Sequence, residues 1–113
     1  MGNSNTMKEI SEEKKLIDRC PEEFRSILIK ALQFAKEQFK ESKRPEGDRY
    51  IDHSIDIALR LQAEEFGSAT VIGGLLHHIE LSKDNLQYIS EEISEDVANI
   101  LKIYSKIDNV IKN

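Results

Sequence analysis

The chain has 113 residues, 39% of them hydrophobic and 33% charged, which suits one hydrophobic core and is too apolar for a disordered protein. A net charge of −5 at pH 7, with no basic stripe interleaved with aromatic residues, argues against a nucleic-acid partner. The longest uncharged stretch, residues 66–79, is too short and too polar to cross a bilayer, so we expect no membrane partner.

The first half of the chain predicts two helices and a loop. Residues 1–7 are expected to be disordered, and residues 8–113 to form a single helical domain that begins with a helix from Lys8 to Arg19. Pro21 then opens a long helix at its first position and the helix runs to about residue 40 or 42, because apolar residues recur at helical spacing. These residues are Phe24, Ile27, Leu28, Ala31, Phe34 and Ala35. Residues 45–48 contain Pro and Gly and predict a loop.

The second half predicts three or four more helices. One runs from Tyr50 to about residue 66, and Ser68 is expected to cap a buried helix over residues 69–79. Within it, Gly73 and Gly74 are expected to let a neighbouring helix approach closely. After a loop at residues 82–84 comes a short helix at 85–93, and Ser94 caps the last one. Its apolar side holds Val97, Ile100, Leu101, Tyr104 and Ile107. No stretch alternates as a strand would, so the fold class is all-α with five to six helices.

All three histidines lie in two short segments, which end at His53 and at His77-His78. Imidazole is the commonest protein ligand for a transition metal, so His53, His77 and His78 form a candidate metal site. Neighbours in a helix project about 100° apart, so His77 and His78 are expected to diverge. The alternative is that these histidines are polar residues facing the core.

The single cysteine, Cys20, excludes an internal disulfide, fits a reducing cytoplasm and is expected to be a structural helix-end residue.

An ordered pattern carries a family resemblance. It consists of Ala31-Leu32-x-Phe34-Ala35, Arg44, Gly47, Tyr50-Ile51-x-His53, Leu75-Leu76-His77 and Ser105-Lys106-Ile107. It resembles the N-terminal part of the HD-domain hydrolases of the RelA/SpoT type, and the likeness runs from about Ile27 to Ile107. The resemblance implies part of an HD-domain, PDEase-like helical bundle. It also implies a divalent metal, usually manganese, whose activated water removes pyrophosphate from the 3′ position of guanosine tetra- or pentaphosphate.

Matched position by position, the resemblance implies that His53 and His77 are metal ligands. It also implies that Arg44 packs on the guanine base and that Tyr50 lines the nucleotide pocket. His78, however, stands where the family has the aspartate of the His-Asp pair, and Glu80 is displaced by one position from the Glu-Asp dyad that assists the attacking water. The family's fourth ligand, an aspartate, would lie beyond residue 113.

These departures predict a catalytically inactive domain with a binding or regulatory role, because a hard hydrolytic cation favours anionic oxygen ligands. We expect no bound metal, with a zinc, nickel or manganese ion on the three histidines as the alternative. The expected partners are a guanosine polyphosphate or another nucleotide, and a second copy or a partner protein that covers exposed apolar surface. The alternative function is a metal-dependent phosphohydrolase in which Glu80 positions water, acting alone or completed by a partner chain.

Overall fold

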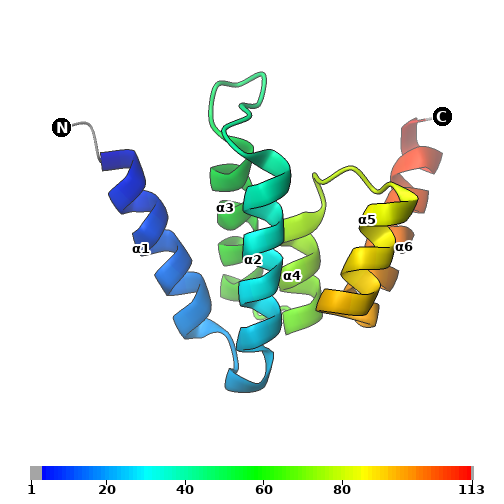
Figure 1. The fold of residues 1–113 in the computed structure, drawn as a ribbon, viewed down its shortest axis with the longest axis horizontal. Helices are drawn as coiled ribbons and strands as arrows, with labels where there is room; N and C mark the ends of the chain where they lie inside the picture. The colour runs from blue at the N-terminus through cyan, green and yellow to red at the C-terminus, as the bar shows by residue number, and fades with distance from the viewer. Residues whose placement is uncertain (1–3, 113) are drawn as a thin grey trace.

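The computed structural model describes residues 4–112, with side chains from residue 11 to residue 111, and shows helices joined by loops and short helical turns (Figure 1). In chain order the elements are α1 (Ser4–Arg19), the 3-10 turn η1 (Glu22–Phe24), α2 (Arg25–Phe39), α3 (Tyr50–Ala63), α4 (Ser68–Leu76), α5 (Lys83–Tyr88), the π-helical turn η2 (Ile89–Ile93) and α6 (Glu95–Lys112). Over residues 4–112 the only β-type pairing is an isolated bridge between Lys43 and Arg49. The predicted all-α class is confirmed.

Over residues 4–112 no helix has the length and apolar character needed to span a membrane.

Helices α2, α3 and α4 form the centre of the molecule, α1 flanks one side and α5 and α6 flank the other (Figure 1). Helix α4 is the element that holds the bundle together, because it packs on α3, α6 and α2. It is the most apolar helix, and Val71, Ile72, Leu75 and Leu76 are all buried. One cluster of buried side chains runs through the bundle from Leu16 in α1 to Leu101 in α6.

Two boundaries near the N-terminus differ from prediction. Helix α1 already includes residues 4–7, which the sequence places in the disordered start; residues 1–3 lie outside the described residues. Pro21 precedes the tight turn η1 and does not begin α2, which starts at Arg25. The turn closes through a bond from the Phe24 amide to the Pro21 carbonyl, and the Arg25 side chain donates to the carbonyl of Cys20 at 3.0 Å. These local bonds, and not the position of Pro21 alone, therefore accompany the start of α2 at Arg25.

Helix α4 begins one residue earlier and ends three residues earlier than predicted. Ser68 is its first residue and makes no capping bond, whereas Gly67 occupies the cap position. The helix ends at Leu76, and the Ile79 amide turns back to the Leu76 carbonyl at 3.0 Å. Burial of Ile79, which is 4% exposed, favours this tight turn over another helical turn. His77 and His78 therefore lie in a turn, and the predicted 100° divergence along a helix is wrong.

The two glycines of α4 mark close helix contacts, as predicted. A Cβ on Gly73 would lie 3.1 Å from Cγ2 of Ile100 in α6, and a Cβ on Gly74 would clash with Cδ1 of Leu61 in α3. The predicted cap of the last helix is also confirmed, since the Val97 amide donates to the Ser94 hydroxyl at 3.2 Å. The absence of a side chain at residues 73 and 74 lets α4 sit between α3 and α6.

The last helix buries less of its apolar surface than the sequence predicts. Val97 and Leu101 are buried, but Tyr104 and Ile107 are each 54% exposed. The bundle covers only the N-terminal half of α6, so its C-terminal half presents apolar side chains to solvent. Helical periodicity identified an apolar face but could not show how much of that face has a partner.

Candidate histidine and arginine site

The three histidines meet at one end of α3 and α4, with His78 in the middle. His53 lies in the first turn of α3, His77 follows the last residue of α4, and His78 comes next. The ring of His78 lies 3.9 Å from that of His77 and 5.1 Å from that of His53, measured between ring centroids. The prediction that a helical fold brings the two histidine segments together is confirmed.

The hydrogen bond made by His77 determines its tautomer. Nδ1 of His77 lies 2.8 Å from the carbonyl oxygen of Gly74, which can only accept a hydrogen bond. Nδ1 therefore carries the proton, and in the neutral ring the lone pair available to a ligand is on Nε2.

Aromatic side chains border the histidines on two sides. The Tyr50 ring lies 5.9 Å from that of His78 and stacks on Phe39 with centroids 5.5 Å apart. On the other side, the Tyr104 ring meets His77 edge to face at 5.4 Å. Tyr50 was predicted at this site from the resemblance. Tyr104 was not, because its helical spacing predicted a core residue; only the packing of α6 on α4 shows that it reaches His77.

His78 is held in its neutral form. The His78 side chain is exposed on one side, yet desolvation by its neighbours, followed by the charges of His77, His53 and Arg44, lowers its pKa from 6.5 to about 4. At neutral pH its ring therefore offers one donor and one acceptor nitrogen and no charge.

Arg44 is bound to acidic residues of its own loop. Its Nη1 lies 3.1 Å from both carboxylate oxygens of Asp48, and Nη2 lies 3.5 Å from Glu46. Desolvation acts to raise the pKa of the Asp48 carboxyl. The hydrogen bond from Arg44, the loop backbone and the charge of Arg44 outweigh it, so the pKa of Asp48 is lowered. Gly47, with φ of 105°, supplies the backbone conformation that closes this turn. A ligand that uses Arg44 must compete with two carboxylates.

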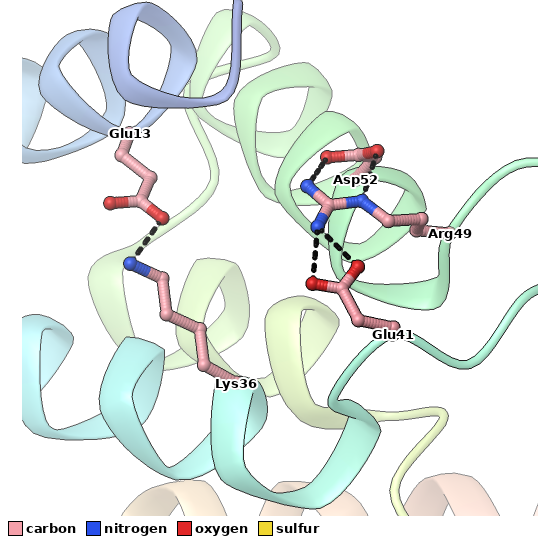
Figure 2. Close-up of polar contacts among 5 residues, drawn as sticks. All are labelled: Glu13, Lys36, Glu41, Arg49 and Asp52. Atoms are coloured by element: carbon pink, nitrogen blue, oxygen red, sulfur yellow. Dashed lines mark hydrogen bonds and ion pairs between the residues drawn. The ribbon is translucent and has the colours of Figure 1, made fainter. Parts of the chain in front are cut away.

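A second arginine, which the sequence did not single out, fixes the position of this loop. Arg49 donates through Nε and Nη2 to Asp52 in α3, each at 3.0 Å, and through Nη1 to Glu41 after α2, at 3.0 and 3.3 Å (Figure 2). Nearby, the Lys36 ammonium lies 2.6 Å from Glu13 and joins α2 to α1 (Figure 2). Arg49 ties the end of α2 to the start of α3, where Tyr50 and His53 lie.

Comparison with known proteins identifies the family. Residues 31–113 match the model of a family described as an HD domain. This chain is an HD-domain protein. It is 33% identical over 98 residues to a guanosine-3′,5′-bis(diphosphate) 3′-pyrophosphohydrolase of Aquifex aeolicus. The matched region covers 86% of this chain and 14% of that protein.

Of two further relatives, one has a similar name and the other is named as a GTP pyrophosphokinase. The HD-domain protein is 32% identical over 98 residues to a probable guanosine-3′,5′-bis(diphosphate) 3′-pyrophosphohydrolase of Mycoplasma pneumoniae, over 82% of this chain and 13% of that one. It is 29% identical over 87 residues to a probable GTP pyrophosphokinase of Mycobacterium leprae, over 76% of this chain and 11% of that one. The chain thus spans less than a sixth of the length of each relative. The resemblance seen in the sequence is confirmed at the level of the family.

The histidine cluster of this HD-domain protein does not fit a hard divalent cation such as manganese. Its three donors are imidazoles, and among the side chains described, those of residues 11–111, no group of three or more His, Cys, Asp or Glu is placed to hold a metal ion. Glu80 is exposed, and its backbone carbonyl accepts from Asn85 at 2.8 Å. Among residues 11–111, no hydrogen bond or ion pair joins the Glu80 carboxylate to a histidine. A zinc or nickel ion on His53, His77 and His78 therefore stays a hypothesis.

The opposite end of α3 and α4 of the HD-domain protein contains a cleft of about 510 Å³ that the sequence did not indicate. Cys20, Leu28, Phe66, Ser68 and Val71 are among its lining residues. Burial raises the pKa of the Cys20 thiol above its ordinary value, despite the nearby charge of Arg25. A protonated, buried thiol is a poor nucleophile, which supports the structural role predicted for Cys20.

Proposed function

We propose that this HD-domain protein is a catalytically inactive binding module for a guanosine polyphosphate or a related nucleotide, with a regulatory role. The observation that carries the proposal is the arrangement of the histidine rings and Tyr50, with the charge of Arg44 acting on His78. Two relatives are named as acting on guanosine-3′,5′-bis(diphosphate), which supports the choice of ligand class.

Each of these groups has a part in recognition. The faces of Tyr50 and His78 can stack on a purine, because an aromatic ring attracts a base without regard to charge. The Arg44 guanidinium carries several donors that suit phosphate or guanine oxygen. The neutral His78 can exchange one hydrogen bond in each direction. A binding role uses all of these groups and requires no metal.

In the part of the chain whose side chains are described, no carboxylate joins the three histidines in a group that could hold a metal ion, which supports an inactive domain. A cation that activates water for phosphate chemistry is normally held by at least one anionic oxygen, which balances its charge. At the position after His77, where the resemblance places an aspartate, this chain has the neutral ring of His78. Replacing a carboxylate with an imidazole removes charge from the ligand set and leaves hydrolysis without its usual cation.

Calorimetric titration with guanosine tetraphosphate tests the proposal on three proteins: the unaltered chain, Arg44→Ala and Arg60→Ala. Arg60 is a matched control, since it also forms an ion pair, 3.1 Å from Asp56, but its side chain is 78% exposed. We expect binding by the unaltered chain, at least a tenfold loss in Arg44→Ala and no change in Arg60→Ala. No heat at millimolar nucleotide, or an equal loss in both variants, would refute the assignment.

The acidic loop gives an independent test. Asp48→Asn removes a charge that neutralises Arg44 and repels phosphate, so we expect the affinity for guanosine tetraphosphate to rise several-fold. Asp56→Asn, which removes an equal charge on the solvent side of α3, is expected to leave the affinity unchanged. Equal affinity of Asp48→Asn and Asp56→Asn for guanosine tetraphosphate would show that Arg44 does not belong to the nucleotide site.

The alternative, a metal-dependent phosphohydrolase, rests on the proximity of the three histidine rings, although the side chains of residues 11–111 form no group placed to hold a metal ion. Guanosine tetraphosphate is incubated with the chain and manganese, zinc or nickel, and the products are separated by chromatography. We expect no release of pyrophosphate and no stoichiometric metal in the purified protein. Turnover that His77→Ala abolishes would replace the binding proposal with the hydrolase. Turnover that requires an added partner chain would point to a divided enzyme.

A further inference from the structure

The C-terminal half of α6 carries a stripe of exposed apolar side chains. The five residues of this α6 stripe are between 54% and 78% exposed: Ile103, Tyr104, Ile107, Val110 and Ile111. The other four each lie three or four residues from Ile107, which places all five on one face of the helix. A contiguous apolar face of this kind marks an interaction surface, whereas isolated exposed apolar residues are ordinary.

The α6 stripe is symmetric about its central residue. Ile103 and Ile111 lie four residues before and after Ile107, and Tyr104 and Val110 lie three residues before and after it. A two-fold interface requires that residue i contacts residue j of the partner while residue j contacts residue i. An antiparallel pairing of two identical stripes meets this requirement with apolar residues at every position.

We propose that two copies of this chain associate through antiparallel α6 helices, with the two-fold axis at Ile107. Ile107 then faces its own counterpart, Ile103 faces Ile111, and Tyr104 faces Val110. The charged residues of the same segment, Lys102, Lys106, Asp108 and Lys112, are outside the stripe. The like charges of Lys102 and Lys112 come opposite each other only at the two ends of the pairing, so no like charges meet at its centre. The proposal does not depend on the nucleotide site.

The size of the α6 stripe suits a weak dimer. Side chains of this kind offer on the order of 100 Å² each when more than half exposed, so a pair of stripes can bury at most about 1,000 Å². That is near the lower limit of roughly 1,000 Å² for specific protein interfaces, and we therefore expect a dissociation constant in the micromolar range.

Pairing through the α6 stripe would also alter the surroundings of the histidines. Tyr104 belongs to the stripe and contacts His77 edge to face. A second copy packed on Tyr104 would bury the side of His77 that α6 borders.

Sedimentation of the 113-residue chain over a range of concentrations tests the pairing, alongside Ile107→Glu and the control Ile29→Glu. Ile29 lies in α2, outside the stripe, and is 39% exposed, so its substitution makes the same chemical change elsewhere. We expect a dimer for the unaltered chain and for Ile29→Glu, and at least a tenfold weaker association for Ile107→Glu with an unchanged circular dichroism spectrum. A monomeric unaltered chain at several hundred micromolar, or a dimer indifferent to Ile107→Glu, overturns the proposal.

Disulfide cross-linking tests the direction of the pairing. Under mild oxidation Ile107→Cys should form a covalent dimer, because each residue 107 faces its counterpart at the axis. Ile103→Cys alone should not cross-link, but a mixture of Ile103→Cys and Ile111→Cys should. The native thiol, Cys20, is 4% exposed and does not compete. Cross-linking of Ile103→Cys to itself would indicate parallel helices and refute the antiparallel arrangement.

Discussion

Arg49 is expected to stabilise the domain by holding the α2–α3 loop on α3. Its side chain is 20% exposed and donates to both oxygens of Asp52 and both oxygens of Glu41. The two acceptors differ in exposure, since Asp52 is 41% exposed and Glu41 is 82% exposed. Solvent screens an exposed pair more strongly, so the two contacts should differ in energy.

The magnitudes follow from this exposure. The two-pronged contact with Asp52 should contribute about 1 kcal/mol, and the contact with Glu41 about 0.5 kcal/mol or less. Arg49→Ala is thus expected to lower the free energy of unfolding by about 1.5 kcal/mol, which lowers Tm by roughly 5 °C for a domain of this size. Arg60→Ala, which breaks an exposed ion pair with Asp56, should change stability by less than about 0.5 kcal/mol.

Two double-mutant cycles, measured by urea unfolding and circular dichroism, separate these contributions. One cycle pairs Arg49→Ala with Asp52→Ala, and the other pairs it with Glu41→Ala. The coupling to Asp52 should be the larger, and 1 M salt should weaken the coupling to Glu41 more. An Arg49→Ala variant as stable as the unaltered chain, or a larger coupling to Glu41, would refute this account of the loop.

Three further outcomes are expected. Leu75→Ala, at a position with no exposed surface, should cost about 3 kcal/mol in urea unfolding because it leaves a cavity in the helix that holds the bundle together; a loss below about 1 kcal/mol would contradict the packing. Ser54→Ala should raise stability by about 0.5–1 kcal/mol, because the buried hydroxyl has no hydrogen-bond partner within residues 4–112; a loss of stability would indicate a bound water. The pKa of His78 is lowered to about 4, so the unfolded chain binds the extra proton first and stability should fall as pH drops from about 6.5 to about 4. An NMR titration of His78 with a midpoint near 6.5 would contradict that shift.

Much of the fold follows from local patterns. Helical spacing of apolar residues predicts α2, α3 and α6, and the Ser94 cap and the glycine pair of α4 are where the sequence places them. The boundaries at Arg25 and Leu76 were missed. They depend on a side-chain bond to a carbonyl and on the burial of Ile79, which are contacts between residues that no single pattern contains.

The candidate site, like the fold, was predicted from the sequence only in part. The sequence and its family resemblance selected His53, His77, His78, Tyr50 and Arg44, with Glu80 for the alternative function. They did not reveal that Arg44 is held by Asp48, that Arg49 anchors the loop, or that His78 occupies the centre of the cluster. Partners across a loop depend on the path of the backbone, which residue spacing does not specify.

The sequence by itself determined an all-helical domain with its imidazoles in two segments and a histidine in place of a carboxylate, because residue type and periodicity are properties of the chain alone. Only the tertiary structure decided how those imidazoles face one another, which acids neutralise the arginines and which side of α6 is left uncovered. Each of these depends on the distance between side chains that are far apart in sequence, and such distances are fixed only when the helices pack.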